Sequence, residues 1–162
     1  MAFGTGTHHT TSLCMELLEK YLTAEDTVLD VGCGSGILAI TAALLGAKDI
    51  IGCDIDEVAV KVAGENAALN GVDDRIAFHK GDLTSQVEGS FNVIVANIVA
   101  DIIIRLCDDV AKYLAKDGIF IASGIIDDRR DDVVAAMNAQ GIEVIEERIN
   151  GGWVALACKV RG

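Results

Sequence analysis

The chain contains no proline and no long hydrophobic run. The absence of proline argues against Pro-rich linkers between domains. No stretch approaches the roughly 18 apolar residues that a transmembrane helix needs. The N-terminus also lacks the basic and apolar pattern of a signal peptide. Together these absences predict a soluble cytoplasmic protein without a membrane partner.

Cations are scarce, with 13 Lys and Arg against 25 Asp and Glu and a formal net charge of −12. A nucleic-acid backbone is bound by clustered Lys and Arg, so this charge argues against a direct nucleic-acid partner. It is compatible with a cationic partner such as a basic protein. Acidity that only keeps the domain soluble explains the same charge equally well.

The cysteines are few, scattered and odd in number, and none forms a C-x-x-C pair. This spacing fits neither a zinc site nor a disulfide framework, so no metal site is predicted. We expect small buried apolar side chains in a reducing compartment. The five are Cys14, Cys33, Cys53, Cys107 and Cys158.

What the sequence does contain is an alternation of apolar strands and amphipathic helices. Residues 1–8 are predicted to be a loop, followed by a helix that Thr10 or Thr11 caps and that runs to about Leu22. The later predicted strands are 27–31, 49–54, 75–80, 91–96 and 118–123, and the helices are 36–46, 57–70, 101–115 and 128–140. Continuous apolar strands alternating with helices predict an α/β fold with a parallel sheet covered on both faces.

The C-terminal residues break this alternation. Two strands, 142–149 and 153–160, flank an Asn-Gly-Gly turn, which predicts an antiparallel hairpin at the end of a mostly parallel seven-stranded sheet. No repeat or domain boundary is visible. The sequence therefore predicts one Rossmann-like domain over residues 1–162.

A glycine-rich turn follows the first predicted strand and opens a helix, as in many sites for nucleotide-like ligands. Its pattern is Asp30-x-Gly32-x-Gly34-x-Gly36. A dinucleotide fingerprint needs Gly or Ala where Ile37 stands, so that fingerprint fails. The pattern resembles instead the first motif of class I S-adenosyl-L-methionine-dependent methyltransferases, in which an acid is available to the ammonium end of the ligand. A purely structural tight turn is the alternative.

Acids at the next strand ends are candidates for contacting the same ligand, because ligands of open parallel sheets bind beyond the carboxyl ends of the strands. Asp54, which follows Gly32 by 22 residues, is placed to accept both ribose hydroxyls. Its neighbour Asp56 is expected to cap the next helix. Asp82 can accept the exocyclic amine of adenine, although a Gly-Asp pair is also common in turns.

Asn97 ends an otherwise apolar strand, where an amide is costly to bury without partners. Facing a methyl donor, its side-chain oxygen can hold an amine nucleophile in line with a sulfonium. We therefore predict a catalytic role for Asn97. The alternative is a cap for the helix expected near Asp101.

Three stretches together resemble the PrmA family, whose members methylate amino groups of a large-subunit ribosomal protein. They are AFGTGTHHTT at residues 2–11, DVGCGSGILAI at 30–40 and VANIVA at 95–100. The resemblance implies S-adenosylmethionine as cofactor, contacted by Thr11, Gly32, Asp54 and Asn97. It also implies that Thr5 and Thr7 lie in a loop over the methionyl end. The acceptor would be a Lys side chain or an N-terminus.

The chain departs from the family pattern at several places. His9 stands where the family has proline, and Glu57 and Asp117 replace two further prolines. Family members also carry an N-terminal domain that binds the ribosomal protein. The sequence is therefore expected to represent the catalytic domain without that recognition domain.

Other functions remain compatible with the sequence. Enzymes that methylate amino groups of nucleic-acid bases follow the strand-end Asn with prolines and a stacking aromatic, which residues 98–100 lack. A nicotinamide-dependent oxidoreductase is disfavoured by Ile37 and by the terminal hairpin. A small-molecule methyltransferase is compatible with the motifs. A domain that binds S-adenosylmethionine without a productive substrate is the alternative that involves no catalysis.

Overall fold

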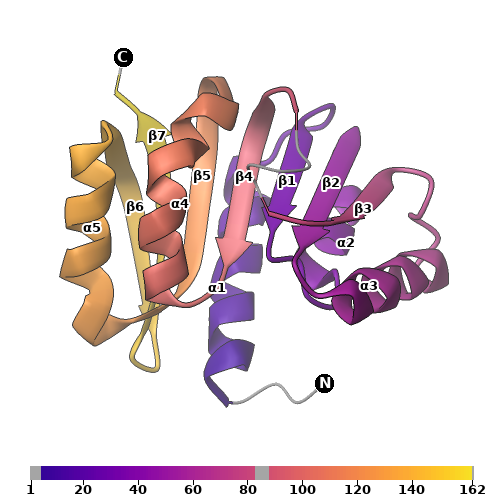
Figure 1. Ribbon diagram of the computed structural model, residues 1–162, viewed down its shortest axis with the longest axis horizontal. Coiled ribbons are helices and arrows are strands. Elements are labelled where there is room, and N and C mark those ends of the chain that lie inside the picture. Colours follow the sequence, from indigo (N-terminus) through magenta and orange to yellow (C-terminus); the bar gives the residue numbers. More distant parts are fainter. Residues whose placement is uncertain (1–4, 83–87, 162) are drawn as a thin grey trace.

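The computed structural model describes residues 5–82 and 88–161, which form a seven-stranded sheet with helices on both faces (Figure 1). The strand order is β3-β2-β1-β4-β5-β7-β6, and β7 runs opposite to the other six strands of this sheet. The predicted α/β fold with a closing hairpin is confirmed. The elements are α1 (Thr5–Tyr21), β1 (Thr27–Val31), α2 (Ile37–Leu44), β2 (Asp49–Asp54), α3 (Glu57–Leu69), β3 (Ile76–Lys80), β4 (Phe91–Asn97), α4 (Ala100–Tyr113), β5 (Leu114–Ile126), a 3-10 turn (Asp127–Arg129), α5 (Arg130–Ala139), β6 (Ile142–Asn150) and β7 (Trp153–Val160).

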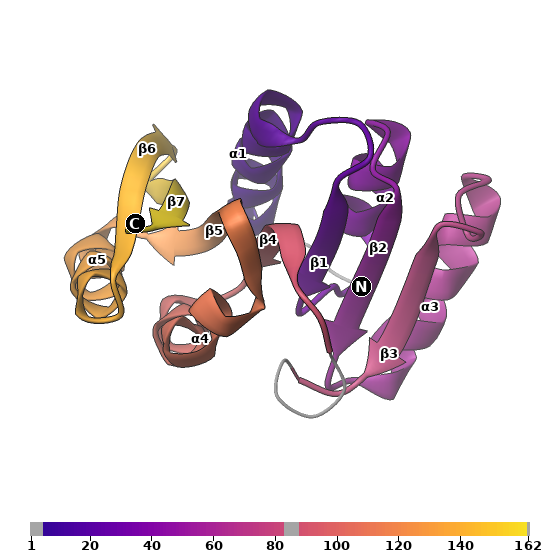
Figure 2. The ribbon, with the colours of Figure 1, turned by 90° about the horizontal axis from the view of Figure 1, so that it is seen from above.

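Alternate side chains of the central strands enter two separate cores. Val28 of β1 packs with α1 and α2, whereas the next residue, Leu29, packs with α4 and α5. In β4, Val95 and Ala96 divide in the same way. Figure 2 shows α1 and α2 on one side of the sheet and α4 and α5 on the other. Both faces of these strands are thus covered, which explains why their sequences are continuously apolar.

The strand order of the sheet reverses between β1 and β4. The chain proceeds from β1 outward to β2 and β3, and then returns to the other side of β1 to form β4 and β5. Loops that leave the carboxyl ends of β1 and β4 therefore diverge and leave a crevice between them. This switch point is where the structure places the glycine-rich turn and the end of β4.

The first helix begins earlier than the sequence suggested. The prediction of a loop over residues 1–8 is wrong for residues 5–8, because α1 starts at Thr5 and includes Thr7. Thr10 and Thr11 lie within this helix and do not cap it. A proline at position 9 would disrupt a helix interior, whereas His9 supplies the N–H that the helix needs. Residues 1–4 lie outside the described part of the chain.

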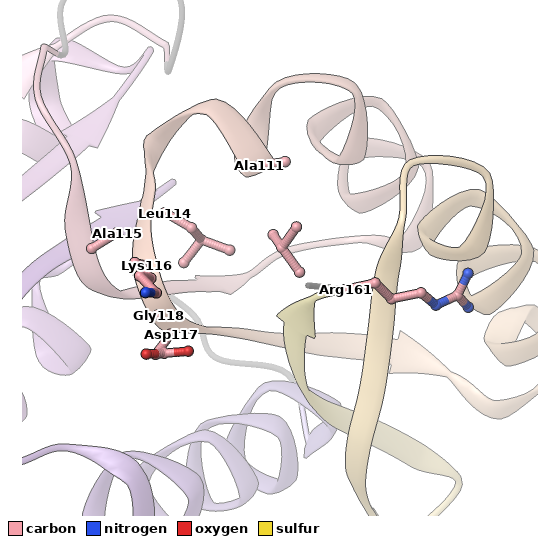
Figure 3. A pocket seen from close by; sticks show the side chains of 8 residues that line it. Ala111, Leu114, Ala115, Lys116, Asp117, Gly118 and Arg161 are labelled. Carbon is pink, nitrogen blue, oxygen red and sulfur yellow. The ribbon is translucent and has the colours of Figure 1, made fainter.

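The boundary between α4 and β5 also differs from the prediction. The helix ends at Tyr113, and β5 begins at once with Leu114, which pairs with Phe91 of β4. A cavity of about 270 Å³ lies here, with Lys116 and Arg161 at its border (Figure 3). It is at the amino ends of the parallel strands. It is therefore remote from the switch point.

All five cysteines are free and buried, as predicted. Burial raises the pKa of each thiol, to about 11 for Cys53 and for Cys107. These side chains behave as small apolar groups of the core. Across residues 5–82 and 88–161, no helix is both long enough and apolar enough to span a bilayer.

Candidate functional site

The glycine-rich turn is tied to the end of β2. The backbone N–H groups of Gly32 and Cys33 both donate to the carbonyl oxygen of Cys53, at 2.8 and 3.0 Å. Gly36 has a φ of 86° and forms the N-cap of α2 without a side-chain cap. The start of the turn is therefore held by the backbone of β2. The N-terminus of α2 points toward it.

Gly32 is required by both conformation and space. Its φ is 70°, and a Cβ at this position would lie only 2.8 Å from Cγ2 of Ile98, which follows β4. The backbone of the turn therefore packs directly against the segment after β4. Only glycine permits this close approach.

Asp54 is oriented by two backbone donors at the end of β2. Its Oδ2 accepts the N–H of Gly34 at 2.9 Å, and its Oδ1 accepts the N–H of Asp56 at 2.9 Å. Each carboxylate oxygen retains a second lone pair, so the group can still accept two hydroxyls. Asp56 caps α3 by accepting the N–H of Val58, as predicted. The carboxylate of Asp54 is thus fixed before any ligand binds.

Asp30 differs from Asp54 and Asp82 in its burial. It is only 1% exposed and lies beneath the glycine-rich turn. Its Oδ2 accepts the N–H of Ala39 in the first turns of α2, at 3.1 Å. Burial raises the pKa of Asp30 to about 7, an effect that the Ala39 hydrogen bond opposes and the charge of Asp54 reinforces. The carboxyl group therefore joins β1 to α2.

This burial predicts a pH-dependent stability difference between the protein and its Asp30→Asn variant. An unfolded Asp ionises near pH 3.8, whereas the folded group ionises near 7. Stability is therefore lost as pH rises between these values, at about 1.4 kcal/mol per pH unit. Asn stays neutral, so the variant should gain stability relative to the parent from about pH 4 to about pH 7 and no further above it. Urea unfolding across this range tests this, and a constant difference would contradict it.

Asn97 contacts the first helix and does not cap the fourth. Its Nδ2 donates to Oγ1 of Thr11 at 3.3 Å. The N-cap of α4 is Val99, which forms no side-chain cap, so the capping interpretation of Asn97 is wrong. Sequence reasoning missed this contact because α1 and β4 are distant in the chain.

A cavity of about 260 Å³ opens at the switch point, and we call it the switch-point cavity. It unites Gly32, Asp54 and Asp82 of the predicted site. Thr11, Asp30, Gly34 and Asn97 are not among its lining residues. Thr5 and Thr7 lie in the first turn of α1, so the predicted loop there is corrected. The residues that line the cavity are Val31, Gly32, Cys53, Asp54, Ile55, Gly81, Asp82, Ile98 and Ile102.

The sequence prediction overlooked the apolar part of this cavity. Ile55 and Ile98 directly follow the predicted polar residues at the ends of β2 and β4, and Ile102 lies in the first turn of α4. Ile55 is 76% exposed, which is unusual for so large an apolar side chain. The position of Ile55 directly after a strand-end acid was the sequence signal that could have indicated its place in the cavity. Among the described residues, no group of His, Cys, Asp and Glu is arranged to hold a metal ion.

Comparison with known proteins identifies the family. The sequence matches the family described as "Ribosomal protein L11 methyltransferase (PrmA)" over residues 1–161. This chain belongs to the PrmA family. The resemblance inferred from three sequence stretches is thereby confirmed.

Individual PrmA relatives match the whole chain. A ribosomal protein L11 methyltransferase of Alkaliphilus oremlandii is 49% identical over 162 residues, which are 100% of this chain and 52% of that protein. Another, from Caldicellulosiruptor bescii, is 53% identical over 159 residues, with 98% and 52% covered. The chain therefore spans about half the length of these curated relatives.

Solved structures confirm the class I methyltransferase fold. The crystal structure of a ribosomal protein L11 methylase from Lactobacillus delbrueckii subsp. bulgaricus has a TM-score of 0.93 at 39% identity, covering 97% of this chain and 81% of that one. An RNA methyltransferase from Salinibacter ruber, in complex with S-adenosyl-L-homocysteine, has a TM-score of 0.74 at 20% identity, covering 97% and 92%. At that identity, the second likeness shows the fold alone.

Proposed function

We propose that residues 1–162 form a single catalytic domain that transfers methyl groups from S-adenosylmethionine to amino groups of ribosomal protein L11. The observation that carries the proposal is the family match over residues 1–161, combined with the oriented carboxylate of Asp54 at the switch-point cavity. A ribosomal acceptor implies a cytoplasmic reaction. The net charge of −12 favours cationic partners over nucleic acid.

We assign the adenosine part of the cofactor to the switch-point cavity. Asp54 would offer its two oxygens to the ribose hydroxyls, and Asp82, which also lines the cavity, would accept the exocyclic amine of adenine. Ile55, Ile98 and Ile102 supply apolar surface for the base. The methionyl part would extend along the turn toward Thr11, with Thr5 and Thr7 on the same helix.

Asn97 and its apolar surroundings would act on the acceptor amine. The bound cofactor supplies a methyl group that its sulfonium already activates, so the protein mainly positions the amine. A Lys ammonium, with an unperturbed pKa near 10.4, must first lose a proton to water, since no side chain is assigned as its base. Apolar surroundings disfavour the charged form and assist this step. The oxygen of Asn97 can then accept an N–H of the neutral amine and orient its lone pair.

Calorimetric titration followed by a transfer assay tests the proposal. S-adenosylhomocysteine should bind and a nicotinamide dinucleotide should not. Labelled methyl groups should then move from S-adenosylmethionine to purified ribosomal protein L11. Absence of S-adenosylhomocysteine binding would refute the cofactor assignment. Binding without transfer would favour a domain that only binds the cofactor, and transfer to small amines alone would favour a small-molecule methyltransferase.

A further inference from the structure

A bulge interrupts β5 beside the end of β4. The pairing of β5 with β7 shifts in register between Ala122 and Ile125, so Ser123 and Gly124 lie in the irregular segment. Gly124 has a φ of 83°, a conformation that strongly favours glycine. In the parallel register, Ser123 is the partner of Asn97. The irregularity is therefore adjacent to the proposed catalytic amide.

A side chain at position 124 would clash with the backbone after β4 and would crowd the side chain of Asn97. A Cβ at position 124 would lie 3.0 Å from Oδ1 of Asn97 and 2.7 Å from the carbonyl oxygen of Ile98. The backbone has little freedom to relieve such a contact, because the N–H of Ile98 donates to the carbonyl of Ser123 at 3.1 Å. The bare backbone of Gly124 thus limits where the amide oxygen can lie.

Ser123 fixes the other end of the same amide through the first helix. Its side chain is fully buried, and its Oγ donates to the carbonyl oxygen of Thr10 at 3.0 Å. The next residue of α1, Thr11, accepts the hydrogen bond from Nδ2 of Asn97. Ser123 therefore holds the helix segment that holds the amide nitrogen.

We infer that Ser123 and Gly124 are positioning residues for Asn97, one through its amide nitrogen and the other through its amide oxygen. This inference rests on the proposed function, since it concerns the orientation of the acceptor amine. A donor–acceptor geometry displaced by about 1 Å can reduce turnover by about 100-fold. The two residues would thereby affect catalysis without being among the residues that line the switch-point cavity.

Gly124→Ala tests the inference against Gly141→Ala, a control with matched backbone strain. Gly141 has a φ of 73°, but a Cβ there would meet nothing within 4 Å. Gly124→Ala should lower kcat for methyl transfer to ribosomal protein L11 by roughly 10- to 100-fold. Because Gly124 does not line the switch-point cavity, the variant should change the Kd for S-adenosylhomocysteine by less than about threefold. Gly141→Ala should change neither value by that much.

A spectroscopic measurement separates positioning from a loss of stability. In protein carrying ¹⁵N-labelled asparagine, the side-chain resonance absent from Asn97→Asp identifies the Asn97 amide. Gly124→Ala should shift or broaden this resonance, and Gly141→Ala should not. If Gly124→Ala does not fold, Ser123→Ala takes its place and should shift the resonance with a loss of kcat of roughly tenfold.

The outcomes distinguish this inference from the proposed function. A parent chain that binds no S-adenosylhomocysteine or transfers no methyl group would refute the function itself. A fully active parent whose folded Gly124→Ala variant keeps both its kcat and the Asn97 resonance would overturn the positioning role alone. If Gly124→Ala does not fold, an unchanged kcat and an unchanged Asn97 resonance in Ser123→Ala would overturn the positioning role instead.

Discussion

Replacing Asp54 with alanine should weaken S-adenosylhomocysteine binding by about 100- to 10,000-fold, because hydrogen bonds to a charged group contribute about 1.5–3 kcal/mol each. Two ribose hydroxyls would lose their acceptor at once. The variant would also free the N–H of Gly34, which now donates to Oδ2 of Asp54 at 2.9 Å. Titration calorimetry of the parent and variant measures the change directly.

Asp56→Ala is the matched control, because Asp56 is an acid only two residues away with a different partner. It caps α3 through the N–H of Val58, so its loss should lower the free energy of unfolding by about 1 kcal/mol. Affinity for S-adenosylhomocysteine should change little. Equal losses of affinity in Asp54→Ala and Asp56→Ala would contradict the ribose assignment.

The sequence was sufficient to predict most of the architecture because its signals are local. Continuous apolar strands such as 93–96 indicated burial on both faces. The predicted hairpin is also present, with Asn150 ending β6 and with Gly151 and Gly152 in the turn at φ of 60° and 81°. Element ends were less predictable. α1 begins at Thr5, within a stretch of Gly and Thr that was predicted to be a loop. The start of β5 depended on pairing between Leu114 and Phe91, which are far apart in sequence.

The candidate site was predicted unevenly for a similar reason. Gly32, Asp54 and Asp82 lie at or just after strand ends, so a rule about the edge of a parallel sheet predicts that they lie close together, and all three line one cavity. Whether Asp30 faces the ligand or the core depends on packing beneath the turn, and the structure buries it against α2. The contact between Thr11 and Asn97 requires α1 to cross the sheet at β4, which no local pattern specifies.

Asn97→Ala should produce the largest loss of turnover, about 100- to 1,000-fold in kcat, as expected when a preorganised polar group is removed from a reacting centre. The amide would no longer orient the acceptor amine, whereas Asp54 and the glycine turn would still hold the cofactor. Affinity for S-adenosylhomocysteine should therefore fall much less than kcat. Methyl transfer to ribosomal protein L11 at saturating cofactor measures the effect.

Asn92→Ala provides the control, since Asn92 is the same residue type in the same strand, at the opposite end. Its Oδ1 accepts the N–H and the Oγ1 hydroxyl of Thr27, at 2.9 and 3.1 Å. This variant should lose stability, by about 1 kcal/mol per lost hydrogen bond, and retain its turnover when folded. If Asn97→Ala instead lowers affinity and kcat equally, Asn97 binds the cofactor and does not orient the amine. An unchanged kcat in Asn97→Ala would refute the catalytic role of Asn97.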